Sequence, residues 1–206
     1  MRKIGRPLSF DRCKALEVAM ETFWRYGYAG ASISALTSDM GITAPSLYAA
    51  FGDKESLYIA AVDWYLRQPS HDLKLLLKST STAYEAIEAI LFSAAKQQTR
   101  PGSPQGCMLM SAFVSSPVAS SVEKYLISAR QNIQTLIEKR IRRGINEGDV
   151  PSSVVAADLA RFYIMVLQGM SVQARDGAGQ TELSTLAKQS LAAWPMRKPL
   201  VASEAQ

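Results

Sequence analysis

The chain has 206 residues, enough to bury a core and to hold a small domain beside a larger one. Cys13 and Cys107 lie far apart, no CxxC motif occurs and His71 is the single histidine, so neither a disulfide framework nor a zinc site is supported. A net charge of +5 fits a polyanionic partner, and because no apolar run reaches roughly 18 residues we expect a cytoplasmic protein without membrane, metal or cofactor.

The first residues concentrate positive charge. Residues 1–70 hold eight Lys or Arg against seven Asp or Glu, yet Arg2, Lys3 and Arg6 crowd into the first six positions. We therefore expect residues 1–8 to form a flexible basic arm that contacts a polyanion. The alternative is a disordered tail that only improves solubility.

Apolar residues recur three and four positions apart along most of the chain, which predicts helices and an all-α fold. Four helices are expected in residues 9–70, which we take as one domain. Each begins after a residue that can cap it and ends near a glycine or a proline. The expected helices begin after Ser9 or Asp11, Ser32, Thr43 and Asp53, and they end at Gly27, Gly41, Gly52 and about Gln68.

The second and third expected helices are short and are joined by the turn Gly41-Ile42-Thr43. A glycine at such a turn supplies the positive φ with which a chain often leaves a helix. Two short helices joined in this way beneath a longer one form a helix-turn-helix, whose second helix enters the major groove of DNA. The spacing therefore predicts a three-helix DNA-binding domain, although short helical pairs also occur in proteins that do not bind DNA.

Three segments of this region resemble the signature of the TetR/AcrR family of transcriptional regulators. They are FWRYGY at 23–28, ASISAL at 31–36 and MGITAPSLYAAFGDKESL at 40–57. The glycine turn, the Leu-Tyr pair, the phenylalanine and the Asp-Lys-Glu start of the fourth helix all recur in register. The resemblance implies a homodimeric repressor that binds a palindromic operator in double-stranded DNA and is released by a small-molecule effector.

The resemblance also implies which residues grip the DNA backbone. Tyr48 and Lys54 fall where the family contacts phosphates, and a phenol, or an ammonium beside the free amides of a helix start, suits that role. The alternative is that Tyr48 is a core residue. Ser32 and Thr43 are expected to cap their helices and can also donate to the backbone.

Base recognition is expected at the start of the third helix and in the arm. The short side chains of that helix offer one or two hydroxyls and an apolar surface suited to a thymine methyl, so their readout is sparse. These residues are Thr43, Ala44, Pro45 and Ser46. Gly5-Arg6-Pro7 resembles the element with which AT-hooks place an arginine in a narrow minor groove, which would supply further specificity.

Residues 71–206 are expected to form a separate helical bundle for effector binding and dimerisation. Helices are predicted near 71–78, 83–98, 107–115, 118–147, 153–176 and 181–194. The segments GCMLM at 106–110 and QGMSVQARDG at 168–177 resemble a TetR subgroup that includes copper- and electrophile-responsive repressors.

In such regulators the last two helices form the dimer interface, and the apolar pattern of the chain agrees. Apolar residues recur at steps of three and four, and Gly169 permits close helix approach. The expected interface consists of Leu159, Phe162, Tyr163, Val166, Gly169, Met170 and Gln173 on one helix, and of Leu183, Leu186, Leu191 and Trp194 on the next. The alternative is that this stripe faces the core of its own subunit. Two recognition helices spaced one DNA turn, roughly 34 Å, apart also need a two-fold axis.

An effector pocket is expected between the helices of this second domain. The apolar and aromatic residues that would line it are Cys107, Met108, Met110, Phe113, Tyr125, Leu126 and Phe162, each of which can equally be core. With no charge directed inward, a small and mostly hydrophobic ligand is expected. It would act by favouring a spacing of the two DNA-binding domains that cannot bind the operator.

Cys107 has a second interpretation. Electrophile-sensing relatives carry a reactive cysteine in the same Gly-Cys context, and an expected helix start beside it favours the thiolate. No lysine or arginine is adjacent in sequence, so the alternative is a buried core thiol. Copper binding by Cys107, Met108, Met110 and His71 lacks a paired ligand spacing.

Two other functional classes fit the sequence less well. An enzyme needs a nucleophile with a base or a pair of carboxylates, and no such constellation stands out, so we expect no catalysis. A TetR-fold protein that binds DNA without any effector is the closer rival. A filled C-terminal core would favour that rival, and a sizeable, closed cavity would disfavour it.

Overall fold

The computed structural model describes residues 10–68, 73–110 and 120–195, in which the chain forms nine α-helices and no strand. The helices are α1 (Arg12–Gly30), α2 (Ile33–Met40), α3 (Ala44–Phe51), α4 (Lys54–Leu66), α5 (Leu73–Ser79), α6 (Ala83–Gln98), α7 (Ser120–Glu147), α8 (Ala156–Arg175) and α9 (Gln180–Leu191). The expected all-α fold is confirmed. None of the described helices is both long enough and apolar enough to cross a bilayer.

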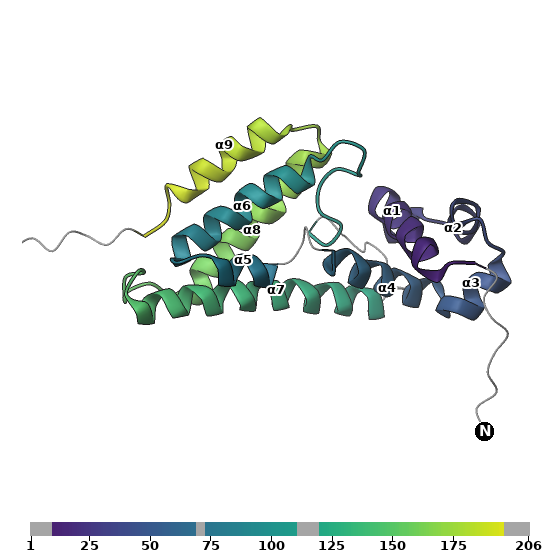
Figure 1. Ribbon diagram of the computed structural model, residues 1–206, viewed down its shortest axis with the longest axis horizontal. Coiled ribbons are helices and arrows are strands. Elements are labelled where there is room, and N and C mark those ends of the chain that lie inside the picture. Colours follow the sequence, from purple (N-terminus) through teal and green to yellow (C-terminus); the bar gives the residue numbers. More distant parts are fainter. Residues whose placement is uncertain (1–9, 69–72, 111–119, 196–206) are drawn as a thin grey trace, which may run out of the picture.

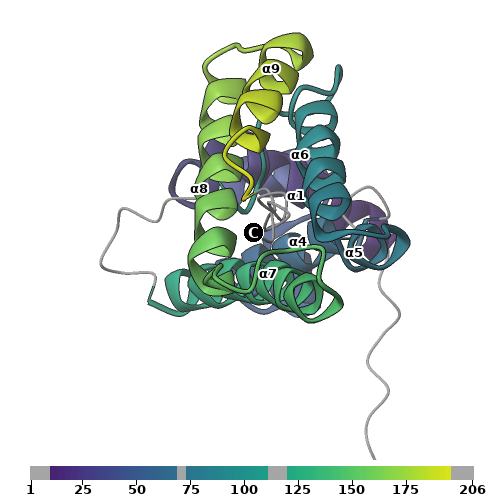
Figure 2. The ribbon, with the colours of Figure 1, turned by 90° about the vertical axis from the view of Figure 1, so that its left-hand side faces the viewer.

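The helices gather at the two ends of an elongated molecule. The helices α1–α3 lie at one end, α6, α8 and α9 lie at the other, and the long helix α7 runs along one side (Figure 1). Seen from the end, α8 and α9 stand opposite α6, with α7 across the bottom (Figure 2). Helix α4 packs on α1 and α7 and so joins the two ends. We call α1–α4 the reading head.

The helix starts in the reading head follow from local capping. Asp11, Ser32, Thr43 and Asp53 each accept a hydrogen bond from a backbone amide two or three residues farther along. These bonds satisfy amides that the first turn of a helix leaves free. The expected starts of all four helices are confirmed, with Asp11 as the cap of α1.

Two of the glycines with a positive φ shape the ends of the first two helices. Gly27 has φ +72° and breaks the regular geometry of α1, while Gly41 has φ +64° and ends α2. Glycine adopts this conformation without the steric cost that a Cβ would add. The expected break after the first helix and the turn between the second and third are therefore confirmed.

The core of the reading head draws on all four of its helices. Leu16, Leu36, Leu47 and Leu57 are buried together with aromatic residues of α1 and α4. The rings of Phe23 and Tyr58 meet edge to face, with centroids 4.9 Å apart. Edge-to-face contact is the favoured geometry of such pairs and stabilises the packing of α1 on α4.

Helix α7 takes part in two cores. Val122, Leu126 and Ala129 in its first half complete the core of the reading head. Ile137 and Ile141 in its second half belong to the core formed with α6, α8 and α9. The division of the chain into two domains near residue 70 stays a prediction. The first half of α7, which lies after this boundary, packs on the helices before it.

One expected helix is wrong in the part that the structure describes. Residues 107–110, which begin the expected helix 107–115, form a turn. Gly106 has φ +79°, and the amide of Cys107 donates to the Ser171 hydroxyl of α8 at 2.7 Å. A Cβ on Gly106 would lie 2.7 Å from the Ser171 carbonyl oxygen. Contacts with a distant helix therefore hold this backbone out of helical geometry.

Candidate nucleic-acid interface

The turn between α2 and α3 is held in place from two sides. Within the turn, the Ile42 amide donates to the Thr37 carbonyl at 3.1 Å, beside the left-handed Gly41. From outside it, the Thr22 hydroxyl of α1 donates to the Asp39 carboxylate at 2.8 Å. The bond ties the end of α2 to α1, so the orientation of the helix-turn-helix is fixed relative to the longer helix.

Helix α3 has a buried face and an exposed face. Leu47 and Phe51 are buried, whereas Tyr48 keeps 48% of its surface exposed. Neighbouring residues on an α-helix point about 100° apart, so the burial of Leu47 turns Tyr48 outward. The alternative that Tyr48 is a core residue is therefore wrong, and its side chain is available to a partner outside the chain.

The expected base-reading residues form the first turn of α3 and its cap. Thr43 Oγ1 accepts from the Ser46 amide at 3.4 Å and lies 2.9 Å from the Ser46 hydroxyl. Pro45 is exposed in the first turn, where its missing amide costs little, and Ala44 is half-buried. The turn therefore presents hydroxyls and a small apolar surface side by side, as the sequence predicts.

Lys54 stands at the start of α4 against an aromatic ring. Its Nζ lies 4.6 Å from the centroid of the Tyr28 ring, an attractive arrangement for a cation, and partial burial lowers the pKa of Lys54. Beside it Asp53 caps α4, and the Ser56 amide that donates to it lowers the pKa of this carboxyl. The geometry is compatible with the expected phosphate contact by Lys54, because the positive end of the helix dipole lies there.

The structure says less about the other residues that we expect to contact DNA, Ser32 and the basic arm. Ser32 is exposed and caps α2 by accepting from the Ala35 amide at 3.0 Å. Arg2, Lys3 and Arg6 lie outside the described residues. Contact between the arm and DNA therefore stays a prediction.

Sequence reasoning missed the residues that position this surface. Tyr28 holds the ammonium of Lys54, and Asp39 accepts the hydrogen bond from Thr22. Each pair joins residues of different helices, which meet only once α1 has packed on α4 and α2. No local pattern in the sequence signals such pairs.

The expected dimer stripe mixes two faces of α8 and α9. Five of its residues are buried in the subunit's own core: Tyr163, Met170, Leu183, Leu191 and Trp194. Three are partly buried against that core: Leu159, Phe162 and Val166. Only Gly169, Gln173 and Leu186 are exposed. For the five buried residues the expected place in a dimer interface is therefore wrong, because their side chains pack inside their own subunit.

A second apolar face points outward from the same helices. Met165 is 56% exposed and Val172 38% exposed, and both lie on α8 with Gly169 between them. Leu186 of α9 is also exposed. A Cβ on Gly169 would meet no atom within 4 Å, so the space above this backbone is open. Exposed apolar residues at helical spacing are typical of a surface that another chain covers.

The expected effector-pocket residues do not come together. Met108 is buried in the core of the reading head and Met110 in the other core, against which Phe162 is partly buried. Phe113 lies outside the described residues. Tyr125 lines a groove of about 510 Å³ between α4, α5 and α7. We call this the α4–α5–α7 groove.

The lining of the α4–α5–α7 groove is only partly hydrophobic. Its apolar residues are Leu66, Leu73, Ala129, Ile133 and Leu136, and its polar residues are Asp63, Arg67, Lys74, Tyr125, Ser128 and Asn132. The expectation that no charge faces an effector pocket therefore does not hold for this groove. A separate cavity of about 340 Å³ lies between the reading head and the end of α8, and Met108 and Arg175 are among the residues that line it.

Cys107 lies where three elements meet. The Tyr65 hydroxyl of α4 donates to its Sγ at 3.4 Å, and its own amide is bound to α8 through Ser171. The residue keeps some exposed surface, but burial raises the pKa of its thiol. Because the expected helix start is absent as well, the geometry favours a protonated structural thiol over a reactive thiolate.

Comparisons with known proteins agree with this geometry. The family described as "Bacterial regulatory proteins, tetR family" matches residues 15–61. The HTH-type transcriptional repressor ComR of Escherichia coli (strain K12) is 33% identical over 195 residues, which are 93% of this chain and 92% of that protein. The HTH-type transcriptional repressor BdcR of the same strain is 28% identical and covers 89% of this chain and 88% of its own length.

A solved structure is similar over the whole fold. It contains a cysteine-substituted variant of the TetR family transcriptional regulator CifR, in complex with 26 bp of double-strand operator DNA. The two chains share 38% sequence identity with a TM-score of 0.88, over 93% of this chain and 100% of the other.

Proposed function

Because the chain belongs to the tetR family of bacterial regulatory proteins, we propose that it is a cytoplasmic transcriptional repressor that binds a palindromic operator through α2 and α3. One observation carries the proposal. Thr43, Pro45 and Tyr48 are exposed on a helix that Leu47 and Phe51 anchor in the core. The relatives ComR and BdcR are named as repressors, and the CifR variant was solved with operator DNA. Such regulators act by binding, without catalysis.

Selection of genomic fragments by the purified protein tests this function. We expect enrichment of a palindromic site whose affinity falls steeply with salt, because phosphate contacts release counterions. If no fragment is enriched above non-specific binding, with or without cell extract as a source of effector, the proposal is wrong.

A single hydroxyl provides a sharper test on the selected operator. We expect Tyr48→Phe to weaken operator binding by about tenfold, because a hydrogen bond to a charged phosphate is lost from each subunit. Tyr26→Phe is the matched control, since Tyr26 is 57% exposed but lies on α1. Equal effects of the two substitutions in a fluorescence anisotropy titration would contradict a specific role for Tyr48.

The proposed repressor is a homodimer. The outward apolar face of Met165, Gly169 and Val172 on α8, together with the exposed Leu186 on α9, supports an interface formed by these two helices. A two-fold axis through this interface would present two copies of α3 to a palindromic site.

The proposed repressor also responds to a small molecule. Helix α4 begins at Lys54, the residue proposed to contact DNA. It ends at Leu66, which lines the α4–α5–α7 groove. A ligand that favours one placement of this end of α4 would change the spacing of the two reading heads and thus the population that binds DNA. The groove is open rather than closed and its lining is not wholly apolar, so it meets only in part the condition that would disfavour DNA binding without an effector.

A further inference from the structure

The α4–α5–α7 groove combines an apolar floor with a charged rim. We propose that it binds an amphipathic organic anion, a carboxylate that carries an apolar chain, and that this anion is the effector. The inference rests on the proposed function for its regulatory meaning, but the binding itself is measured on the protein alone.

The floor of the groove provides the apolar contact. Ala129, Ile133 and Leu136 follow one another at steps of four and three on α7, and Leu66 and Leu73 face them from α4 and α5. The volume of about 510 Å³ falls in the range of pockets that hold small organic ligands. An aliphatic chain of moderate length would bury its surface here and gain the corresponding hydrophobic free energy.

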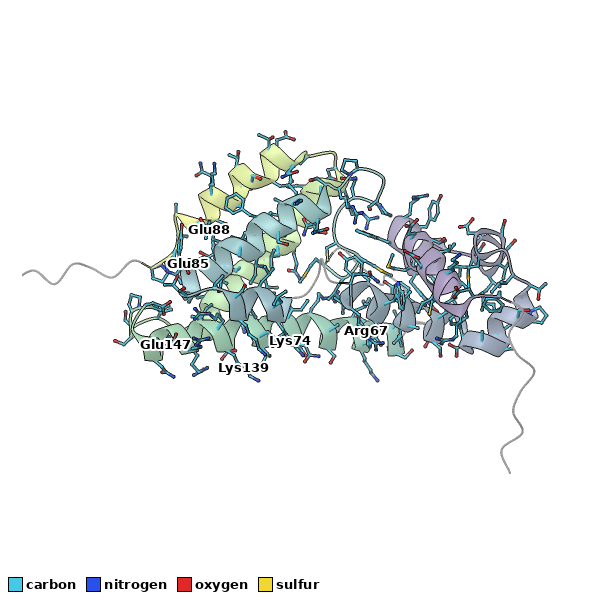
Figure 3. The ribbon with its side chains drawn as sticks, viewed as in Figure 1. Arg67, Lys74, Glu85, Glu88, Lys139 and Glu147 are labelled. Atoms are coloured by element: carbon cyan, nitrogen blue, oxygen red, sulfur yellow. The ribbon has the colours of Figure 1, made fainter. Side chains whose placement is uncertain are left out.

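The rim of the groove carries an excess of positive charge. Arg67 follows the last turn of α4 and Lys74 lies in the first turn of α5, so two cations from neighbouring elements border one groove (Figure 3). Among the described residues that line the groove, Asp63 is the single carboxylate. Within the described residues Lys74 forms no ion pair with an acidic side chain. Within the described part of the lining, two cations therefore stand against one carboxylate.

The carboxylate of Asp63 is already engaged by the protein. The Tyr125 hydroxyl of α7 donates to one of its oxygens, and Arg67 lies 3.8 Å from the other. Burial, together with the hydrogen bond to Asp63, raises the pKa of Tyr125, so the phenol stays a donor at neutral pH. Asp63 thus holds Arg67 at the rim, and its own charge is partly offset.

These charges distinguish between three classes of ligand. A cationic amphiphile would meet Arg67 and Lys74 at the rim and be repelled. A neutral apolar molecule would displace water from both cations and offer neither of them an acceptor, which costs free energy. A carboxylate would accept from the guanidinium of Arg67, while the ammonium of Lys74 supplies a second charge and Asn132 an amide donor. The geometry therefore selects the anion.

Three probes with one chain length and three head groups test the proposal. Decanoate, decanol and decyltrimethylammonium are titrated into the full-length protein by isothermal calorimetry, below the concentrations at which they form micelles. We expect decanoate to bind at least about tenfold more tightly than decanol, and decyltrimethylammonium not to bind. No binding of decanoate, or equal binding of decanoate and decanol, overturns the proposal.

Two substitutions locate the site. We expect Arg67→Ala and Lys74→Ala each to weaken decanoate binding by about fivefold and to leave decanol binding within about twofold, because only the head group loses a partner. Lys139→Ala is the matched control, since this exposed lysine lies on α7 outside the groove, farther toward Glu147 (Figure 3). The same loss in the control would assign binding to general surface charge and overturn the site.

A DNA measurement separates this inference from the proposed function. Operator affinity is measured with and without decanoate for the wild-type chain and for Lys139→Ala. Operator binding that decanoate weakens supports both proposals. If the protein binds its operator but does not bind decanoate, or binds both without coupling, the effector assignment fails and the repressor stands. If decanoate binds but no operator is found, the repressor fails while the ligand site stands.

Discussion

In the C-terminal half, Asp149 joins two segments that are far apart in the sequence. Its carboxylate accepts from the backbone amide of Ala83, so it pins the α7–α8 connection to the start of α6. Close packing surrounds it, because a Cβ on Gly144 would meet both Asp149 and Ala83. The carboxylate therefore accepts from an amide at the start of a helix. Because the two residues are far apart in the sequence, no local pattern predicts this pair.

We expect Asp149→Ala to lower the free energy of unfolding by about 1–3 kcal/mol, because the amide of Ala83 loses a charged acceptor in a partly buried site. Asp158→Ala is the control, since Asp158 forms only an exposed pair with Arg161 at 3.6 Å and should cost less than about 1 kcal/mol. Urea denaturation of the three proteins measures the difference. Equal stabilities of the two variants would show that Asp149 makes no special contribution.

At the scale of elements, the connection around Gly106 joins α6, α8 and the reading head. Cys107 is held there between Tyr65 and Ser171, and burial raises the pKa of its thiol. A raised pKa lowers the thiolate fraction at every pH below it, and only the thiolate is nucleophilic. We therefore expect the Cys107 thiol in this connection to react slowly.

Differential alkylation measures that property. We expect iodoacetamide at pH 7.5 to label the exposed Cys13 at least about tenfold faster than Cys107, with the gap narrowing as the pH rises and vanishing in urea. Peptide mass spectrometry gives both rates from one sample. Labelling of Cys107 as fast as that of Cys13 in the folded protein would restore the interpretation of Cys107 as a reactive sensor.

The elements differ in how far the sequence predicts them. The caps Ser32, Thr43 and Asp53 act within three residues, so local reasoning finds the helix starts of the reading head and with them the exposed first turn of α3, which we propose faces DNA. The turn at 107–110 is different, because it depends on Ser171, which lies 64 positions from Cys107. The orientation of α8 is also not predictable from local sequence. Its apolar residues occupy two faces, and periodicity alone does not say which face packs inside.

At the scale of the whole molecule, the outward face of α8 predicts the oligomeric state. We expect Val172→Asp to convert a dimer into monomers, because a two-fold axis brings the new charges of both subunits into one apolar interface. Ile127→Asp is the control, since Ile127 is similarly exposed but lies on α7. Sedimentation velocity distinguishes the species. A dimeric Val172→Asp protein would place the interface elsewhere.

Because helix α7 contributes to both hydrophobic cores, it limits how the chain can be divided into separate fragments. Leu109, Val122 and Leu126 cover apolar residues of the reading head, although they follow it in the chain by some forty positions or more. A chimaera that grafts these first helices onto a foreign sensor must therefore carry the first turns of α7 with them. The unit that can be transferred therefore ends within helix α7 and not in the linker between two domains.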